Sequence, residues 1–384
     1  MNNGEIPAAG RRAWPLGNGE IELALTVRGG QMAPVRFFAD SESPVEPYYV
    51  SPWQEEGEDV PGPGVLYALR GDFFCMPFGG VNELDGETHP PHGEVCESEW
   101  TLVSRREEGG AAALTAELET RIRPGKVTKT IALKSGHAAL YISHRIEGFA
   151  GPVSLGHHAI MPGDRTLHLS TRPLLAGICD TDPPPPSSRE YASMPPGAFF
   201  DDLAAVPTIW KDPPTTDCSI FPAREGFVDI IQVFPKPEDG RPLWFTAAVP
   251  SHGYLWYSLK DPDLLPSTVL WQENRGRHGA PWNGRNSCLG IEEVLAHLAS
   301  GLTVSAGENA LTRRGLRTSM TLGGSGVLDV RNIQGVCRIP ENFDRVLDVD
   351  FVDGGLVFRS ASGRAVEAAV DWHDVLDDRR KADA

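Results

Sequence analysis

The chain has 384 residues, of which 40% are hydrophobic and 23% charged, and this is the composition of an ordinary soluble globular protein. Its 35 Lys and Arg stand against 52 Asp and Glu, which gives a formal net charge of -17. Such a charge repels nucleic acid, anionic membranes and polyanionic substrates at long range. We therefore expect a neutral small molecule as the ligand, with neither nucleic acid nor a membrane as a partner.

The cysteines indicate a reducing compartment. All six are scattered along the chain and none forms a Cys-x-x-Cys pair, so neither a disulfide framework nor a zinc knuckle is indicated. The first residues lack a basic region followed by an apolar stretch, and nowhere do about 18 apolar residues follow one another. The sequence predicts a cytoplasmic protein and leaves a monomer and a homodimer open.

Short runs of alternating apolar and polar residues predict antiparallel strands. The first pair spans residues 20–38 and turns at Arg28-Gly29-Gly30, which is typical of a hairpin. Similar runs follow at 100–103, 113–122, 126–133, 138–146, 228–233, 244–249 and 254–259. With 41 Gly and 33 Pro to form turns, this density predicts an all-β fold, a large sandwich of antiparallel sheets. Helix-like spacing occurs only at 292–300 and after Val366, so we expect few, short helices.

The length allows two or three domains or one large β domain. We expect one β-sandwich domain at 15–305, a C-terminal β extension at 306–376 packed on the same sandwich, and a charged, flexible tail at 377–384. Residues 180–214 include four consecutive prolines, which cannot occupy a central strand because proline lacks the ladder donor. This segment is predicted to be a long surface loop, either a lid over a site or a plain connector.

Histidine and glutamate recur in three segments that could be brought together by folding. These are His89-Pro90-Pro91-His92-Gly93-Glu94, Gly156-His157-His158 and Cys288-Leu289-Gly290-Ile291-Glu292-Glu293. The two residue types can move protons in opposite directions at one site. Because side chains alternate along a strand, only one histidine and one glutamate of each adjacent pair can face a given pocket. The residues alone leave open which one does.

These segments resemble the aldose 1-epimerase and galactose mutarotase-like superfamily, which includes the hexose-6-phosphate mutarotase-like proteins. The resemblance covers roughly residues 20–293. It is carried by Arg70-Gly71, Pro77-Phe78-Gly79 and His92-Gly93, then by Gly156-His157-His158, and then by the strand that ends in Glu292. It implies a large antiparallel supersandwich and an isomerase that interconverts the α and β anomers of a free sugar.

The resemblance also implies roles for particular residues. Glu292 would be the general base and His158 the general acid, while His92 and Arg70 would bind the sugar. Trp282, with Trp53 and Trp271, could supply the flat apolar faces on which sugar C–H groups pack. Both proton-transfer groups return to their starting states, so the reaction needs no cofactor and no metal.

One departure from the family pattern bears on the substrate. The phosphosugar members carry an arginine three positions after the His-Gly pair, and this chain has Cys96 there, among several glutamates. The expected sugar is therefore unphosphorylated.

Two other functions stay open from the sequence. One is a carbohydrate-binding protein on the same scaffold without turnover, because fold does not fix function. The other is a metal-dependent enzyme in which His89, His92, Glu94 and another histidine bind a divalent ion, although His-x-x-His on a proline-rich loop is a weak signal.

Overall fold

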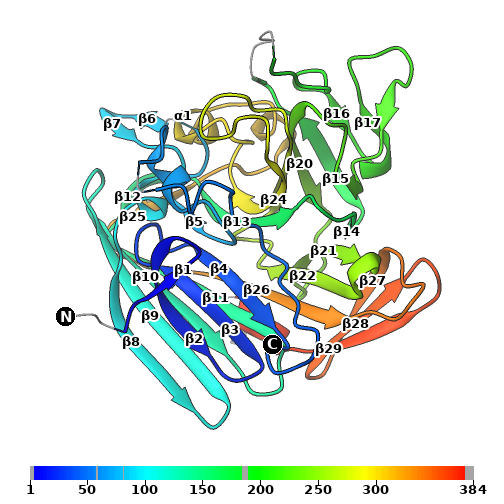
Figure 1. The fold of residues 1–384 in the computed structure, drawn as a ribbon. Coiled ribbons are helices and arrows are strands. Elements are labelled where there is room, and N and C mark those ends of the chain that lie inside the picture. Colours follow the sequence, from blue (N-terminus) through cyan, green and yellow to red (C-terminus); the bar gives the residue numbers. More distant parts are fainter. Residues whose placement is uncertain (1–3, 58, 81, 184–188, 377–384) are drawn as a thin grey trace.

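The computed structural model describes residues 4–57, 59–80, 82–183 and 189–376, and Figure 1 shows two large antiparallel sheets with smaller ones around them. One short α-helix, α1 (Leu302–Ala306), and several 3-10 turns are the only helical elements of these residues. The predicted all-β class is confirmed. Among the described residues, no helix is long and apolar enough to cross a membrane.

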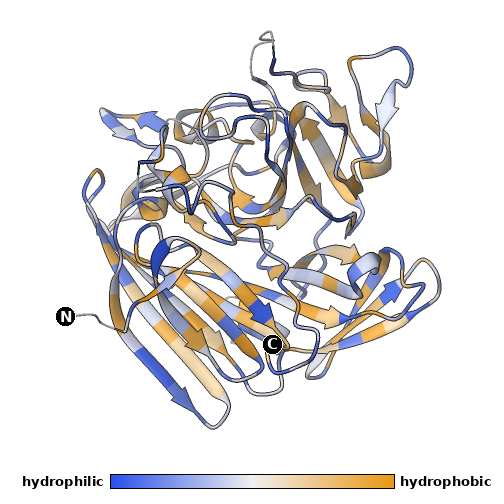
Figure 2. Cartoon of the chain, in the orientation of Figure 1, coloured by the Kyte–Doolittle hydropathy of each residue, from blue (hydrophilic) through white to orange (hydrophobic). Residues whose placement is uncertain are grey.

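The larger sheet has nine strands in the order β19-β14-β21-β22-β26-β11-β10-β9-β8. In chain order they are β8 (Thr101–Glu108), β9 (Ala111–Thr120), β10 (Gly125–Leu133), β11 (Ala139–Glu147), β14 (Leu167–Thr171), β19 (Ile220–Phe221), β21 (Leu243–Val249), β22 (Tyr254–Lys260) and β26 (Val327–Arg338). Figure 2 shows that the edge strand β8 is largely hydrophilic, and its burial pattern is mostly exposed. A polar edge of this kind discourages pairing with another chain.

The second sheet has seven strands in the order β16-β15-β20-β23-β24-β13-β5. They are β5 (Phe74–Cys75), β13 (Leu155–Pro162), β15 (Leu174–Cys179), β16 (Phe199–Phe200), β20 (Phe227–Pro235), β23 (Ser267–Asn274) and β24 (Ser287–Leu295). Every residue of β23 is buried, so both faces of this sheet are covered.

Two further sheets cover the nine-stranded sheet from opposite sides. The four-stranded sheet contains β1 (Ile6–Ala8), β2 (Arg11–Gly17), β3 (Ile21–Thr26) and β4 (Met32–Phe37), and β3 with β4 confirms the predicted first hairpin. It shares one large apolar core with both big sheets. The three-stranded sheet contains β27 (Val346–Val352), β28 (Gly355–Ser360) and β29 (Ala365–Ala369), which pack on the other face through a second core.

Three small two-stranded pairs complete the strands of the described chain. They are β6 (Asn82–Leu84) with β7 (Glu87–His89), β12 (Ala150–Val153) with β25 (Met320–Gly323), and β17 (Val206–Pro207) with β18 (Thr215–Thr216).

The prediction of a helix at 292–300 is wrong. Its first residues continue β24, which pairs with β13 on one side and β23 on the other, and these two ladders outweigh local apolar spacing. After Val366 the chain completes β29 and then makes only a 3-10 turn at Trp372–Val375.

The structure covers only part of the predicted loop, tail and domain boundaries. Residues 184–188 of the predicted long loop and the predicted tail at 377–384 lie outside the described residues. The segment after 306 contributes β26 to the middle of the nine-stranded sheet. The proposed boundary at 305 stays a prediction.

Candidate functional site

Two neighbouring strands of the seven-stranded sheet bring the paired histidines and glutamates opposite each other. In the β13–β24 ladder, His158 lies across from Glu292 and His157 lies across from Glu293. Side chains on a strand alternate between faces, so the two pairs point to opposite sides of the sheet. His158 and Glu292 face an open cavity, whereas His157 and Glu293 face the core between the two large sheets.

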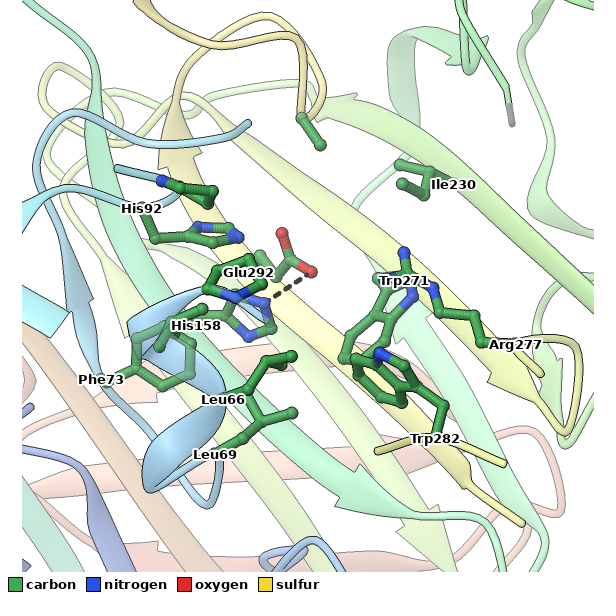
Figure 3. A pocket seen from close by; sticks show the side chains of 14 residues that line it. Leu66, Leu69, Phe73, His92, His158, Ile230, Trp271, Arg277, Trp282 and Glu292 are labelled. Atoms are coloured by element: carbon green, nitrogen blue, oxygen red, sulfur yellow. Dashed lines mark ion pairs between the residues drawn. The ribbon is translucent and has the colours of Figure 1, made fainter. Parts of the chain in front are cut away.

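The floor of the cavity is a direct contact between an imidazole and a carboxyl group. His158 Nε2 lies 3.2 Å from Glu292 Oε1, the contact drawn as a dashed line in Figure 3. The cavity holds about 190 Å³, less than the volume that drug-sized ligands need. Its walls are Pro63, Val65, Leu66, Leu69, Phe73, Pro91, His92, His158, Ile230, Trp271, Arg277, Trp282, Glu292 and Ala299.

Local packing gives the Glu292 carboxyl its room. Gly290 lies two residues earlier on the same face of β24, and a Cβ placed there would lie 2.5 Å from Glu292 Oε1. The carboxyl group therefore occupies space that a side chain at position 290 would fill.

Burial shifts His158 and Glu292 toward their neutral forms. It lowers the pKa of His158 well below 6.5, and the charge of nearby His92 lowers it further. Burial raises the pKa of Glu292 well above 4.5, while the guanidinium of Arg277 opposes that rise. Removing water disfavours the charged form of either group. The pair therefore tends to hold one proton in total, and the neutral forms place it on Glu292; its transfer to His158 gives the ionised pair.

His92 reaches the cavity from a loop with an unusual backbone. Its φ is 62°, a left-handed conformation that is uncommon outside glycine. Gly93 follows at φ 80°, where a Cβ would lie 2.0 Å from the carbonyl oxygen of Met76. The His92 ring meets the His158 ring edge-on at 5.2 Å. Burial, followed by the charge of Arg277, lowers the pKa of His92 to about 4.

Aromatic rings form the cavity walls. Phe73 stacks on the His158 ring at 4.6 Å, and Trp271 meets Trp282 edge-on at 5.7 Å. Trp271 and Trp282 therefore both line the cavity. Trp53 contacts Trp282 from behind and donates its Nε1–H to the Leu66 carbonyl, so it supports the wall without lining the cavity.

Arg277 is a site residue that the sequence did not suggest. Its guanidinium lies 5.0 Å from the Trp282 ring centroid and 5.5 Å from that of Trp271. Nε approaches Glu273 Oε2 at 3.5 Å, and burial raises the pKa of Glu273 to about 7. A single arginine on a loop carries no motif, so no sequence pattern could have identified it.

The substrate-binding role predicted for Arg70 is wrong. Arg70 is fully buried and does not line the cavity. Its guanidinium donates to backbone carbonyls of Ala8, Ala9, Ala33 and Ala68 and to Gln54. It provides hydrogen-bond donors to carbonyl groups in the first 70 residues, and buried backbone carbonyls require such donors.

The residues of the metal hypothesis contact different partners instead of converging on one point. His89 Nε2 lies 3.0 Å from Glu87 Oε2. Glu94 accepts hydrogen bonds from the backbone N–H groups of Arg121 and Ile122. Within the described ranges, no group of three or more His, Cys, Asp or Glu is arranged to hold a metal ion.

The inward-facing members of the two pairs belong to a buried polar network. His157 Nδ1 lies 3.0 Å from Asp72 Oδ2. Glu293 accepts hydrogen bonds from Ser258 and Asn332, and Lys260 Nζ lies 3.9 Å from its carboxylate. This network joins the seven-stranded sheet to the nine-stranded sheet directly behind the cavity floor.

Several solved protein structures are similar to the structure of this chain. A galactose mutarotase-like protein from Clostridium acetobutylicum matches with a TM-score of 0.57 at 12% identity, over 87% of this chain and 98% of that one. An Escherichia coli protein provisionally named an aldose 1-epimerase gives 0.55 at 12%, over 85% and 99%. A galactose mutarotase related enzyme from Lactobacillus acidophilus gives 0.52 at 9%, over 86% and 99%.

No protein-family model matches the sequence, and no curated protein matches it. The similarity to the solved structures shows that the chain has the galactose mutarotase-like fold. The resemblance expected from its residues is confirmed at the level of the fold.

Proposed function

We propose that this protein is a mutarotase that interconverts the α and β anomers of a free, unphosphorylated aldose. The observation that carries the proposal is the contact of His158 with Glu292 at the floor of a small, aromatic-walled cavity. General acid and base must both lie within hydrogen-bond reach of the reacting atoms. The C1 hydroxyl and the ring oxygen of an aldose are bonded to the same carbon, so two adjacent groups can reach both.

Each turnover begins with the sugar ring closed, Glu292 ionised and His158 protonated. Glu292 takes the proton of the C1 hydroxyl, the C1–ring-oxygen bond breaks, and His158 donates its proton to the ring oxygen. The product is the open-chain aldehyde, with Glu292 protonated and His158 neutral. Rotation about C1–C2 presents the other face of the aldehyde, and the reverse transfers close the ring as the opposite anomer. Atoms and protons balance over the cycle.

The neighbouring groups would position the sugar. Trp271 and Trp282 offer apolar faces to its C–H groups, and His92, neutral at pH 7 because burial lowers its pKa to about 4, can hydrogen-bond a hydroxyl. Arg277 is the one Arg or Lys among the described residues that line the cavity, and it contacts Glu273. This favours a neutral sugar.

The variant Glu292→Gln tests the proposal. It removes the base and keeps the shape, so we expect kcat to fall by about 100-fold or more, the usual contribution of a positioned base, while sugar binding persists. Polarimetry or NMR of a freshly dissolved single anomer measures the exchange, and calorimetry measures the binding. Glu108→Gln, on the exposed edge strand, is the matched control. Full activity in Glu292→Gln would remove this residue from its role.

A carbohydrate-binding protein without turnover is the second candidate. It is favoured by the lowered pKa of His158, because a neutral imidazole binds a hydroxyl well but has no proton to donate. Saturable binding of a sugar, with no acceleration of anomer exchange for any common aldose, would select this function over the first.

A further inference from the structure

A second, larger cavity opens beside the first. It holds about 700 Å³, against about 190 Å³ for the cavity that contains His158 and Glu292. Four residues line both cavities: Ile230, Arg277, Trp282 and Ala299. In Figure 3, Ile230, Arg277 and Trp282 lie on the side of the site away from His92. The two spaces therefore adjoin at these residues.

The lining of the second cavity combines apolar and hydrogen-bonding groups. Val228, Ile230, Trp282 and Val304 supply apolar surface. Asp180, Asp182 and Glu190 supply carboxylates, and Thr181 and Ser300 supply hydroxyls. A site with apolar walls and a few polar groups is typical of ligand binding, and each ionised carboxylate can accept several hydrogen bonds from hydroxyl groups.

The charges restrict the ligand further. Three carboxylates stand against one cation, Arg277, which already contacts Glu273. An anionic ligand would be repelled by this lining and by the net charge of -17. A neutral, hydroxyl-rich chain has the donors that the carboxylates can accept and C–H faces for the apolar wall.

We propose that the natural ligand is a neutral oligosaccharide with a free reducing end. Its reducing sugar occupies the cavity with His158 and Glu292, and the following sugars extend past Trp282 and Arg277 into the second cavity. The proposal rests on the proposed function for the identity of the first site. It adds that a single monosaccharide fills only the smaller part of the available space.

The first experiment compares substrates on the intact protein. Crystalline single anomers of lactose, maltose and cellobiose are dissolved beside those of glucose and galactose, and kcat/KM for anomer exchange is measured by polarimetry. We expect at least one disaccharide to exceed its reducing monosaccharide by about tenfold, the change given by one or two additional hydrogen bonds.

The second experiment blocks the second cavity alone. Gly279 lines only that cavity, and a Cβ there meets nothing within 4 Å at an ordinary backbone conformation. Gly279→Phe should abolish the disaccharide advantage and leave kcat/KM for the monosaccharide unchanged. Gly326→Phe is the matched control, because a Cβ at Gly326 also meets nothing within 4 Å and the residue lies outside both cavities.

A third measurement separates the two proposals. Calorimetry on Glu292→Gln compares the affinities for maltotriose and glucose, and this comparison does not depend on turnover. Equal affinities and equal kcat/KM values would overturn the oligosaccharide proposal and leave the mutarotase proposal standing. Absence of exchange with any sugar, together with tighter binding of maltotriose that Gly279→Phe abolishes, would overturn the mutarotase and support the extended site.

Discussion

At the scale of single residues, the site depends on one position where a side chain is missing. Gly290 leaves the space into which the Glu292 carboxyl group folds, and this places the carboxyl 3.2 Å from His158. The ordinary backbone conformation of Gly290 would accept any residue, so steric room and not φ selects glycine there.

Gly290→Ala should therefore displace the carboxyl group without disrupting the strand. Its new Cβ would lie 2.5 Å from Glu292 Oε1, and a misplacement of about 1 Å can cost about 100-fold in rate. We expect a loss of kcat approaching that size, measured by polarimetry, with an unchanged circular dichroism spectrum. Gly323→Ala, where a Cβ meets nothing within 4 Å, is the control. Unchanged kcat in Gly290→Ala would show that Glu292 has another productive position.

The dependence of kcat/KM on pH should reflect a pair that holds one proton. On the acid side, activity falls when His158 and Glu292 are both protonated, and the lowered pKa of His158 places this limb well below pH 6.5. On the alkaline side, activity falls when the pair loses its proton, and the raised pKa of Glu292 moves this limb upward. We expect no acid limb at pH 6.5, and an acid limb at the pKa of an ordinary histidine would contradict the burial argument.

The direction in which Arg277→Gln shifts the alkaline limb tests the assignment of that limb to Glu292. The Arg277 guanidinium favours ionised Glu292 and so lowers its pKa. Its removal should shift the alkaline limb to higher pH, and a shift to lower pH would contradict the assignment.

At the scale of elements, strands β13 and β24 serve two purposes with their two faces. One face carries His158 and Glu292, and the other carries His157 and Glu293 into the core. Lys260 on β22 lies 3.9 Å from the Glu293 carboxylate, and both side chains are at most 2% exposed. The buried network therefore fixes the cavity floor to the nine-stranded sheet.

Breaking this buried pair should be costly, because the remaining buried charge keeps only neutral hydrogen-bond partners. We expect Lys260→Met and Glu293→Gln each to lower the free energy of unfolding by about 3–5 kcal/mol, measured by urea denaturation. The double variant should lose less than the sum of the two. The exposed pair Arg313 and Glu308 is the control cycle, with a coupling of about 0–1 kcal/mol. Strict additivity at Lys260 and Glu293 would contradict the pairing.

At the scale of the whole molecule, the C-terminal segment is part of the sandwich. Strand β26 pairs with β22 on one side and β11 on the other, in the middle of the nine-stranded sheet. The strands that follow it cover the outer face of that sheet through a separate apolar core.

A chain that ends at residue 326 should therefore fail to fold. Without β26, two strands would present unpaired edges in the middle of the sheet, and the second core would be exposed. We expect insoluble protein on expression, and a chain that ends at residue 376 should remain soluble as the control. A soluble chain ending at 326, with a native β-sheet circular dichroism spectrum, would show that the segment is dispensable.

The sequence by itself determined the all-β class, the first hairpin and the two adjacent pairs that supply His158 and Glu292. The all-β class and the hairpin follow from alternation along a strand, which repeats every two residues. The adjacent pairs follow from the recurrence of histidine and glutamate in a few segments. The helix expected at 292–300 failed for the complementary reason: its residues have helix-like spacing, but two neighbouring strands hold them in a ladder.

Only the tertiary structure decided which face of each strand meets the cavity. A shift of one residue in register reverses every side chain, and the register of β13 with β24 is set by residues more than a hundred positions apart. Local patterns also did not show the contact of Arg277 with Glu273, only four residues apart, or the burial of Arg70 among backbone carbonyls up to 62 residues away. Periodicity reports what a segment can bury, whereas the packing of distant segments decides what it faces.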